Sequence, residues 1–202
     1  EIAKRVFRRG KGGKGVLKPR YLTYGHVVDA AGAVIDEAMA ALFCAPHSYT
    51  GQDVLELQCH GGSVQAQRVL QAVLDAGARP AQPGAFTKLA FLNGRIDLSQ
   101  AEAVMQIVGA QSQRAAQLSQ NQLDGALSRA VRQMADTLLD LMAAIGAAAD
   151  YPEDDVDDTA VRQARAVIGE VMQRLSALLA TAKAGMRYQQ GVRVVIAGRP
   201  NA

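Results

Sequence analysis

The sequence predicts an α+β domain followed by an all-α region. Up to about residue 92 the chain alternates β-rich stretches, turns and short helices, and Asp53–His60 alternates apolar and polar side chains with the period of a strand. From residue 99 to 190 apolar residues instead recur every three or four positions, which is the spacing of packed helices. The stretch Phe91–Val104 joins these two patterns, so we place the boundary at residue 97 and expect domains at 1–97 and 98–190.

In the first domain, glycine, proline and β-branched residues separate the expected elements. The pair Tyr21–Val28 and Val34–Phe43 is interpreted as a hairpin, and Gly77 as the residue that ends a helix. The expected elements are a helix end at Glu1–Arg9, a basic loop at Gly10–Lys18, strands at Tyr21–Val28, Val34–Phe43 and Asp53–His60, a helix capped by Ser63 and running to about Ala76, and a short helix at Gly84–Leu92.

In the second domain, Ser99–Val108 is expected to be a helix capped by Asp97 or Ser99, with Ser99 and Glu102 forming a capping box. Residues 112–149 are expected to form one long helix or two with a bend, and 158–190 another. Their apolar residues predict an antiparallel helical hairpin or bundle with a shared buried seam. On the first of these helices the seam consists of Leu127, Val131, Met134, Leu138, Leu141 and Ile145.

Composition excludes several classes of protein. No apolar stretch is long enough to span a membrane, and no signal peptide is recognisable. The two cysteines, Cys44 and Cys59, form neither a disulfide framework nor a metal motif, and we expect free buried thiols in a cytoplasmic protein. The net charge of +3 is uneven: residues 1–20 are basic and 150–158 acidic. The basic segment suits either RNA phosphates or solvent. The chain begins at Glu1 without a methionine, which suggests a piece of a longer protein.

Two charged residues are candidates for a ligand site. Glu56 lies in mid-strand, on the face opposite Leu55 and Leu57, and a carboxylate there accepts paired hydrogen bonds from the amino and ring N–H groups of a pterin or guanine. Arg95 follows an Asn-Gly turn and suits a carboxylate or carbonyl. The alternative is that both are solvated surface charges. His60, before Gly61-Gly62, has no recognisable nucleophile and is interpreted as structural.

The last twelve residues change character again. Val192–Ala197 is predicted to be a short strand, and Gly198–Ala202 follows it with the first glycine and four further positions of a phosphate-binding loop. The motif's second glycine, lysine and hydroxyl are not in the sequence. A terminal strand with a frayed tail is the competing interpretation.

Taken together, several stretches resemble the tRNA modification GTPase family called MnmE or TrmE. They occur in the family's order and cover most of the chain: KPRYLTYGHV (Lys18–Val27), SYTGQDVLELQCHGG (Ser48–Gly62), PGAFTKLAFLNGRIDLSQAEAV (Pro83–Val104), QLDGALS (Gln122–Ser128), DYPEDDV (Asp150–Val156) and VRVVIAGRPNA (Val192–Ala202).

The resemblance implies an aminomethyltransferase-like folate-binding and dimerisation domain at 1–97, the first part of a helical domain at 98–190, and the start of an α/β Ras-like GTPase domain at 191–202. It implies a homodimer that acts on tRNA with the flavoprotein MnmG (GidA). The implied cofactors are 5-formyl-tetrahydrofolate or a related folate, GTP, potassium and magnesium, and the implied product is a wobble uridine modified at C5.

The resemblance carries roles to three residues. Glu56 and Arg95 are expected to contact the folate, and Asn201 to contact GTP and potassium. No catalytic residue is assigned, and the chain as given is expected not to hydrolyse GTP because the P-loop lysine and later motifs are missing. Ala85 and Leu89 stand where the family usually has a glutamate and an arginine, so those two residues cannot form the ion pairs that charged side chains would form there. The alternatives are a non-catalytic folate-binding and dimerisation module, or a stand-alone aminomethyltransferase-like enzyme.

Overall fold

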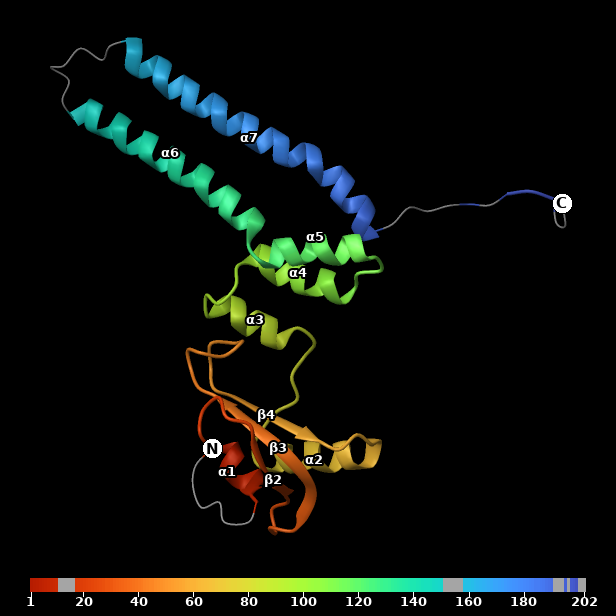
Figure 1. The fold of residues 1–202 in the computed structure, drawn as a ribbon. Coiled ribbons are helices and arrows are strands. Elements are labelled where there is room, and N and C mark those ends of the chain that lie inside the picture. The colour runs from red at the N-terminus through yellow and green to blue at the C-terminus, as the bar shows by residue number, and fades with distance from the viewer. Residues whose placement is uncertain (11–16, 151–157, 191–194, 196, 200–202) are drawn as a thin grey trace. The chain divides into compact units, whose positions relative to one another are not determined.

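A computed structural model describes residues 1–10, 17–150, 158–190, 195 and 197–199, which form two compact units (Figure 1). The units are Glu1–Ile96, which is α+β, and Asp97–Ala202, which is helical wherever it is described as regular structure. The predicted order of an α+β domain before an all-α region is therefore confirmed. Each unit is treated by itself below.

The first unit is built on an antiparallel sheet with strand order β1-β2-β3-β4. Its strands are β1 (Phe7–Arg9), β2 (Thr23–Val28), β3 (Val34–Phe43) and β4 (Val54–Cys59). The helices are α1 (Ile2–Val6), α2 (Ser63–Asp75) and α3 (Ala85–Leu92). The predicted hairpin of β2 and β3 is confirmed, since Tyr24 pairs with Met39 and His26 with Glu37 in antiparallel register.

The helix expected through Arg9 is wrong in its second half. Helix α1 ends at Val6, and Phe7 is extended, with φ −129° and ψ 132°. Phe7 then pairs with Val27 of β2, and its ring is buried in the core. Pairing with a distant strand satisfies the backbone groups of Phe7–Arg9 that a further helical turn would otherwise have bonded.

The core of this unit lies between the sheet and helix α2. Phe7, Val27, Ala38 and Ala40 from the sheet meet Val69 and Ala72 of α2, and Leu55, Leu57 and Cys59 of β4 pack against them. The period-two interpretation of β4 is confirmed, because Glu56 and Gln58 lie on the opposite, exposed face. The two cysteines are free and half-buried rather than buried.

Helix α2 begins without the expected side-chain cap. Its N-cap is Gly62, with φ 157°, and no side chain caps the first turn, so the expected role of Ser63 is wrong. At the other end Gly77 has φ 105°, as predicted for a residue that terminates a helix.

The second unit contains helices α4 (Leu98–Val108), α5 (Gln113–Leu123), α6 (Ala126–Asp150) and α7 (Asp158–Gln190). Asp97 caps α4, but the capping box pairs Asp97 with Gln100, not Ser99 with Glu102 as expected. The N-cap of the box is Asp97, two positions before Ser99, so its partner also lies two positions earlier than expected. The Ser99 hydroxyl instead forms a hydrogen bond with the Ser128 hydroxyl, with 2.9 Å between the two Oγ atoms.

Of the two alternatives for residues 112–149, the structure has two helices, separated at Gly125 with φ 80°. Helices α6 and α7 run alongside each other as the expected hairpin (Figure 1). The expected buried seam is mostly wrong. Met134 is 6% exposed, but Val131 is 48% and Ile145 53% exposed. Two helices alone cover too little of each other to bury a wide apolar face.

Four expectations fall on residues outside the described ranges. They are the middle of the basic loop at Gly10–Lys18, the acidic turn around residues 150–158, most of the strand Val192–Ala197, and Asn201 in the partial phosphate-binding loop. Among the described residues no helix is both long and apolar enough to cross a membrane, and no cluster of three potential metal ligands is found.

Candidate functional site

Glu56 lies in the middle of β4, opposite Ala41 of β3. The pleat sends its neighbours Leu55 and Leu57 to the core and leaves the Glu56 carboxylate exposed on the other face. Within the described part of the chain this carboxylate has no hydrogen bond or ion pair. It is therefore free to accept hydrogen bonds from a ligand.

Arg95 follows the short helix α3, which Asn93 and Gly94 end. Its backbone N–H donates to Ala90 O at 2.8 Å, and its guanidinium is exposed with no partner among the described residues. The aliphatic stem crosses Gly51: a Cβ at that glycine would lie 3.2 Å from Arg95 Cγ. The stem of Arg95 is thus supported while its charged end is available.

The loop beneath Arg95 is held by several polar contacts. Asn93 Nδ2 donates to Thr50 O at 2.7 Å, and Ser48 Oγ donates to Gln52 O at 2.5 Å. Ser48 and Thr50 are buried, and Gly51 has φ 75°, a conformation that favours glycine. These contacts join the segment before β4 to the end of α3 and so fix the base of Arg95. No hydrogen bond or ion pair joins Glu56 to Arg95 in the described structure.

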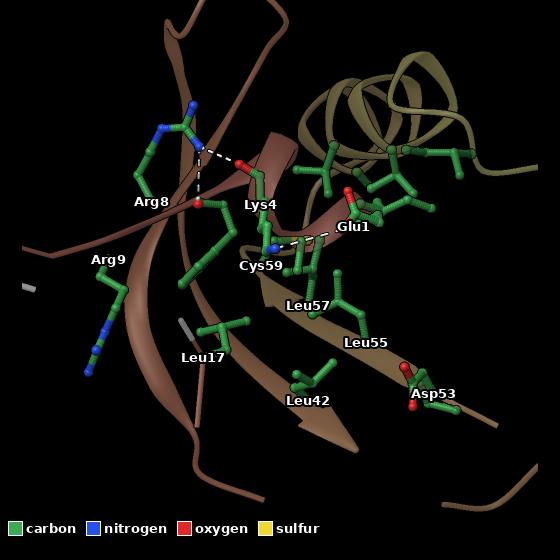
Figure 2. A pocket seen from close by; sticks show the side chains of 18 residues that line it. Glu1, Lys4, Arg8, Arg9, Leu17, Leu42, Asp53, Leu55, Leu57 and Cys59 are labelled. Atoms are coloured by element: carbon green, nitrogen blue, oxygen red, sulfur yellow. Dashed lines mark hydrogen bonds and ion pairs between the residues drawn. The ribbon is translucent and has the colours of Figure 1, made fainter. Parts of the chain in front are cut away.

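A cavity of about 1050 Å³ lies on the core side of the sheet, away from Glu56. Figure 2 shows its apolar wall, to which Leu17, Leu42, Leu55 and Leu57 contribute. Charged residues border it near α1, where Arg8 Nη1 donates to Lys4 O at 2.7 Å and Lys4 Nζ lies 3.7 Å from Glu1 Oε1. Neither Glu56 nor Arg95 lines this cavity, so the cavity and the two predicted ligand residues are separate features.

The structure also contains an Asp–His pair that sequence reasoning missed. His60 Nδ1 donates to Asp36 Oδ1 at 2.8 Å, and the His60 backbone N–H donates to Asp36 Oδ2 at 2.9 Å. Asp36 is buried, whereas the His60 side chain is 71% exposed. The structural interpretation of His60 agrees with these contacts, which tie the end of β4 to β3.

Asp36 and His60 shift each other's pKa values. The side-chain hydrogen bond from His60 holds the pKa of Asp36 below its ordinary value. The hydrogen bond to Asp36, with help from the charges of Asp36 and Glu37, raises the pKa of His60. The pair was missed because it depends on register. Ile35 has no cross-strand partner between the pairs Val28–Val34 and Val27–Asp36, and this bulge sets where Asp36 points.

Both units match families of known proteins. A family model described as the GTP-binding protein TrmE N-terminus matches residues 1–95, and one described as the MnmE helical domain matches residues 98–194. The chain is 44% identical over 204 residues to the tRNA modification GTPase MnmE of Geobacillus kaustophilus and 46% identical over 201 residues to that of Geobacter sulfurreducens. These alignments cover 100% and 99% of the chain, respectively.

The chain spans 44% of the length of each of these two curated relatives. Its two compact units follow one another in the same order as the two family models, and the boundary between the matches, at residues 95–98, contains the boundary between the units. The chain therefore belongs to the MnmE (TrmE) family, with the family's N-terminal domain in its first half and helical-domain sequence in its second.

Proposed function

We propose that the full-length protein is a cytoplasmic tRNA modification GTPase. With a flavoprotein partner, MnmG (GidA), it modifies C5 of the wobble uridine of certain tRNAs, using a one-carbon unit carried by tetrahydrofolate and the hydrolysis of GTP. One observation carries this proposal. Two consecutive domain models of the family match nearly the whole chain, and the whole chain aligns with part of relatives named tRNA modification GTPase.

In this proposal the first domain binds 5-formyl-tetrahydrofolate or a related folate. The pterin ring offers adjacent N–H donors, which the Glu56 carboxylate would accept, while the Arg95 guanidinium would pair with a folate carboxylate or carbonyl. Two features of the structure support these roles. Both side chains are exposed without a partner in the described part of the chain, and Gly51 supports the stem of Arg95.

Calorimetry with 5-formyl-tetrahydrofolate on the full-length protein tests the folate assignment. Glu56→Ala should weaken binding by about tenfold or more, because a hydrogen bond to a charged group contributes about 1.5–3 kcal/mol. Gln58→Ala is the matched control, since Gln58 lies two residues along the same exposed face of β4 and should leave affinity unchanged. Equal affinity in wild type and Glu56→Ala would remove Glu56 from the site.

We assign GTP chemistry to a part of the full-length protein that this chain does not include, apart from Asn201. That residue, outside the described ranges, would contact GTP and help hold potassium, while magnesium would accompany the nucleotide. The full-length protein should hydrolyse GTP faster in potassium than in sodium, and Asn201→Ala should abolish that difference. Absence of any GTP hydrolysis would favour a non-catalytic folate-binding module instead.

The proposal also includes a homodimer formed through residues 1–97. Light scattering on the full-length protein at tens of micromolar should give the mass of two copies. A monomer under those conditions would contradict this part of the proposal without touching the folate assignment.

A further inference from the structure

Another concave surface of the first unit is formed by the end of β1, the start of β2 and the segment that precedes β2. It has a volume of about 560 Å³ and is lined by Arg9, Gly10, Lys18, Tyr21, Leu22, Thr23 and Tyr24. We call it the basic-aromatic patch. None of its lining residues is acidic, and none of them belongs to the candidate folate site.

The aromatic residues of the patch are unusually exposed. Tyr21 is 56% and Tyr24 51% exposed, and Leu22 between them is 52% exposed. Large apolar side chains that gather on a surface commonly mark a binding site. Here Tyr21 and Tyr24 lie close together in the sequence and line the same hollow, so one ligand can contact both rings.

The ring of Tyr24 is held in place by Gly10, the residue that follows β1. The Gly10 backbone N–H donates to Tyr24 O at 3.2 Å, and a Cβ at Gly10 would lie only 2.9 Å from Tyr24 Cδ1. One edge of the ring therefore lies directly on the Gly10 backbone, where glycine leaves room for it. The Glu37 carboxylate accepts a hydrogen bond from the Tyr24 hydroxyl and so raises the pKa of Tyr24.

Positive charge accompanies both rings. Lys18 Nζ lies 4.2 Å from the centroid of the Tyr21 ring, a cation–π contact that keeps the ammonium at the patch. Arg9 is exposed and makes no hydrogen bond or ion pair within the described residues. A free guanidinium and an ammonium beside two exposed rings match the two chemical parts of a nucleotide, its phosphate and its base.

We propose that the basic-aromatic patch binds unpaired nucleotides of the tRNA substrate, with bases against Tyr21 and Tyr24 and phosphates beside Arg9 and Lys18. The inference rests on the proposed function, which supplies the RNA, and adds the surface that holds it. Single-stranded RNA fits better than a protein partner because the lining combines two flat rings with the cations Arg9 and Lys18. The carboxylate of Glu37 accepts a hydrogen bond from the Tyr24 hydroxyl, but Glu37 is not among the lining residues. Unstacked bases in loops are the parts of RNA that aromatic side chains recognise.

Fluorescence anisotropy on the full-length protein with an unmodified tRNA transcript, at several salt concentrations, tests the inference. Tyr21→Ala and Tyr24→Ala should each weaken binding by about tenfold, whereas Tyr21→Phe and Tyr24→Phe should keep wild-type affinity, because stacking requires the ring and not the hydroxyl. Tyr21→Leu preserves apolar bulk without the ring and should weaken binding as alanine does. Circular dichroism melts would confirm that each variant is folded.

The charged residues give an independent readout. The double variant Arg9→Gln, Lys18→Gln should lower the slope of log affinity against log salt by about 1.4, since each single-strand phosphate contact contributes about 0.7. Arg68→Gln is the matched control, because Arg68 is an exposed arginine of α2 outside the patch and should leave affinity and slope unchanged.

Three results would overturn the inference. Wild-type affinity and salt slope in all the patch variants would do so while leaving the proposed function intact. Failure of the wild-type protein to bind the transcript at any salt concentration would overturn both. Loss of self-association in the tyrosine variants with unchanged RNA affinity would assign the patch to a protein interface.

Discussion

At Gly25 the strands β1 and β2 lie too close for a side chain, and replacing this glycine with alanine tests that approach. A Cβ at Gly25 would overlap the Arg8 carbonyl oxygen and lie 2.6 Å from Phe7 Cζ. The oxygen belongs to the backbone of the adjacent strand, which pairs with β2 through Arg9 and Gly25, so it cannot move without weakening that pairing. Phe7 is only 6% exposed and has little room to turn away.

The size of the effect follows from two opposing contributions. Overpacking a filled site costs about 1–3 kcal/mol, and overlap with backbone places this substitution near the upper end. Alanine also reduces the conformational entropy of the unfolded chain, which stabilises the fold by about 0.4–1 kcal/mol. We therefore expect Gly25→Ala to lower the free energy of unfolding of the first unit by about 2 kcal/mol, and its melting temperature by about 8–16 °C.

Urea denaturation followed by circular dichroism measures this change. Gly61→Ala is the matched control, because a Cβ there would meet nothing within 4 Å and the glycine does not have positive φ. It should keep only the contribution of the unfolded chain and raise the free energy of unfolding by up to about 1 kcal/mol. A Gly25→Ala protein as stable as the control would refute the close approach of the two strands.

Three further outcomes are expected. Asp97→Ala should destabilise the helical unit by about 1 kcal/mol in urea denaturation, because α4 loses its cap; equal stability would contradict the capping role. Ser119→Ala should be neutral or stabilising by up to about 1 kcal/mol, since the buried Ser119 hydroxyl has no hydrogen-bond partner among the described residues; a clear loss of stability in the same assay would contradict this. The Asp36–His60 pair should make stability depend on pH. Because the pKa of His60 is raised, its contribution is complete below the ordinary value of 6.5 and is lost as pH rises through the folded pKa. Because the pKa of Asp36 is lowered, its contribution is present above its ordinary value of 3.8 and is lost as pH falls through the folded pKa. Nearby Glu37 favours the charged histidine, and His60→Gln should flatten both limbs of a stability–pH profile; an unchanged profile would show that other groups control it.

Elements with a strong local pattern were predictable from the sequence. Strand β3 has the predicted bounds, Val34–Phe43, and β4 shows the predicted alternation, which also placed Glu56 on the exposed face. Helix α7 occupies the predicted residues 158–190. For β4 and α7 the periodicity of the element itself carries the information, whereas β3 follows from the hairpin with the strand before it.

Features that depend on distant partners were not predictable. Phe7–Arg9 forms a strand because it pairs with β2. The local sequence of Glu1–Arg9 does not indicate that pairing partner. The support of Arg95 by Gly51 requires a contact between Asn93 and Thr50, which are 43 positions apart. The pairing of Asp36 with His60 requires a bulge in β3. The predicted roles of Glu56, Arg95 and Asn201 stay predictions.

The exposed apolar side chains along α6 and α7 affect how this chain behaves in solution. Leu139, Met142 and Ile145 of α6 and Met172 and Leu179 of α7 are each more than half exposed. A preparation of these 202 residues should self-associate and bind to hydrophobic chromatography media through these exposed apolar side chains. This hydrophobic association should become stronger as the salt concentration rises. The proposed homodimer is therefore better tested on residues 1–96 in parallel with the full-length protein, because association through α6 and α7 would also give the mass of two copies.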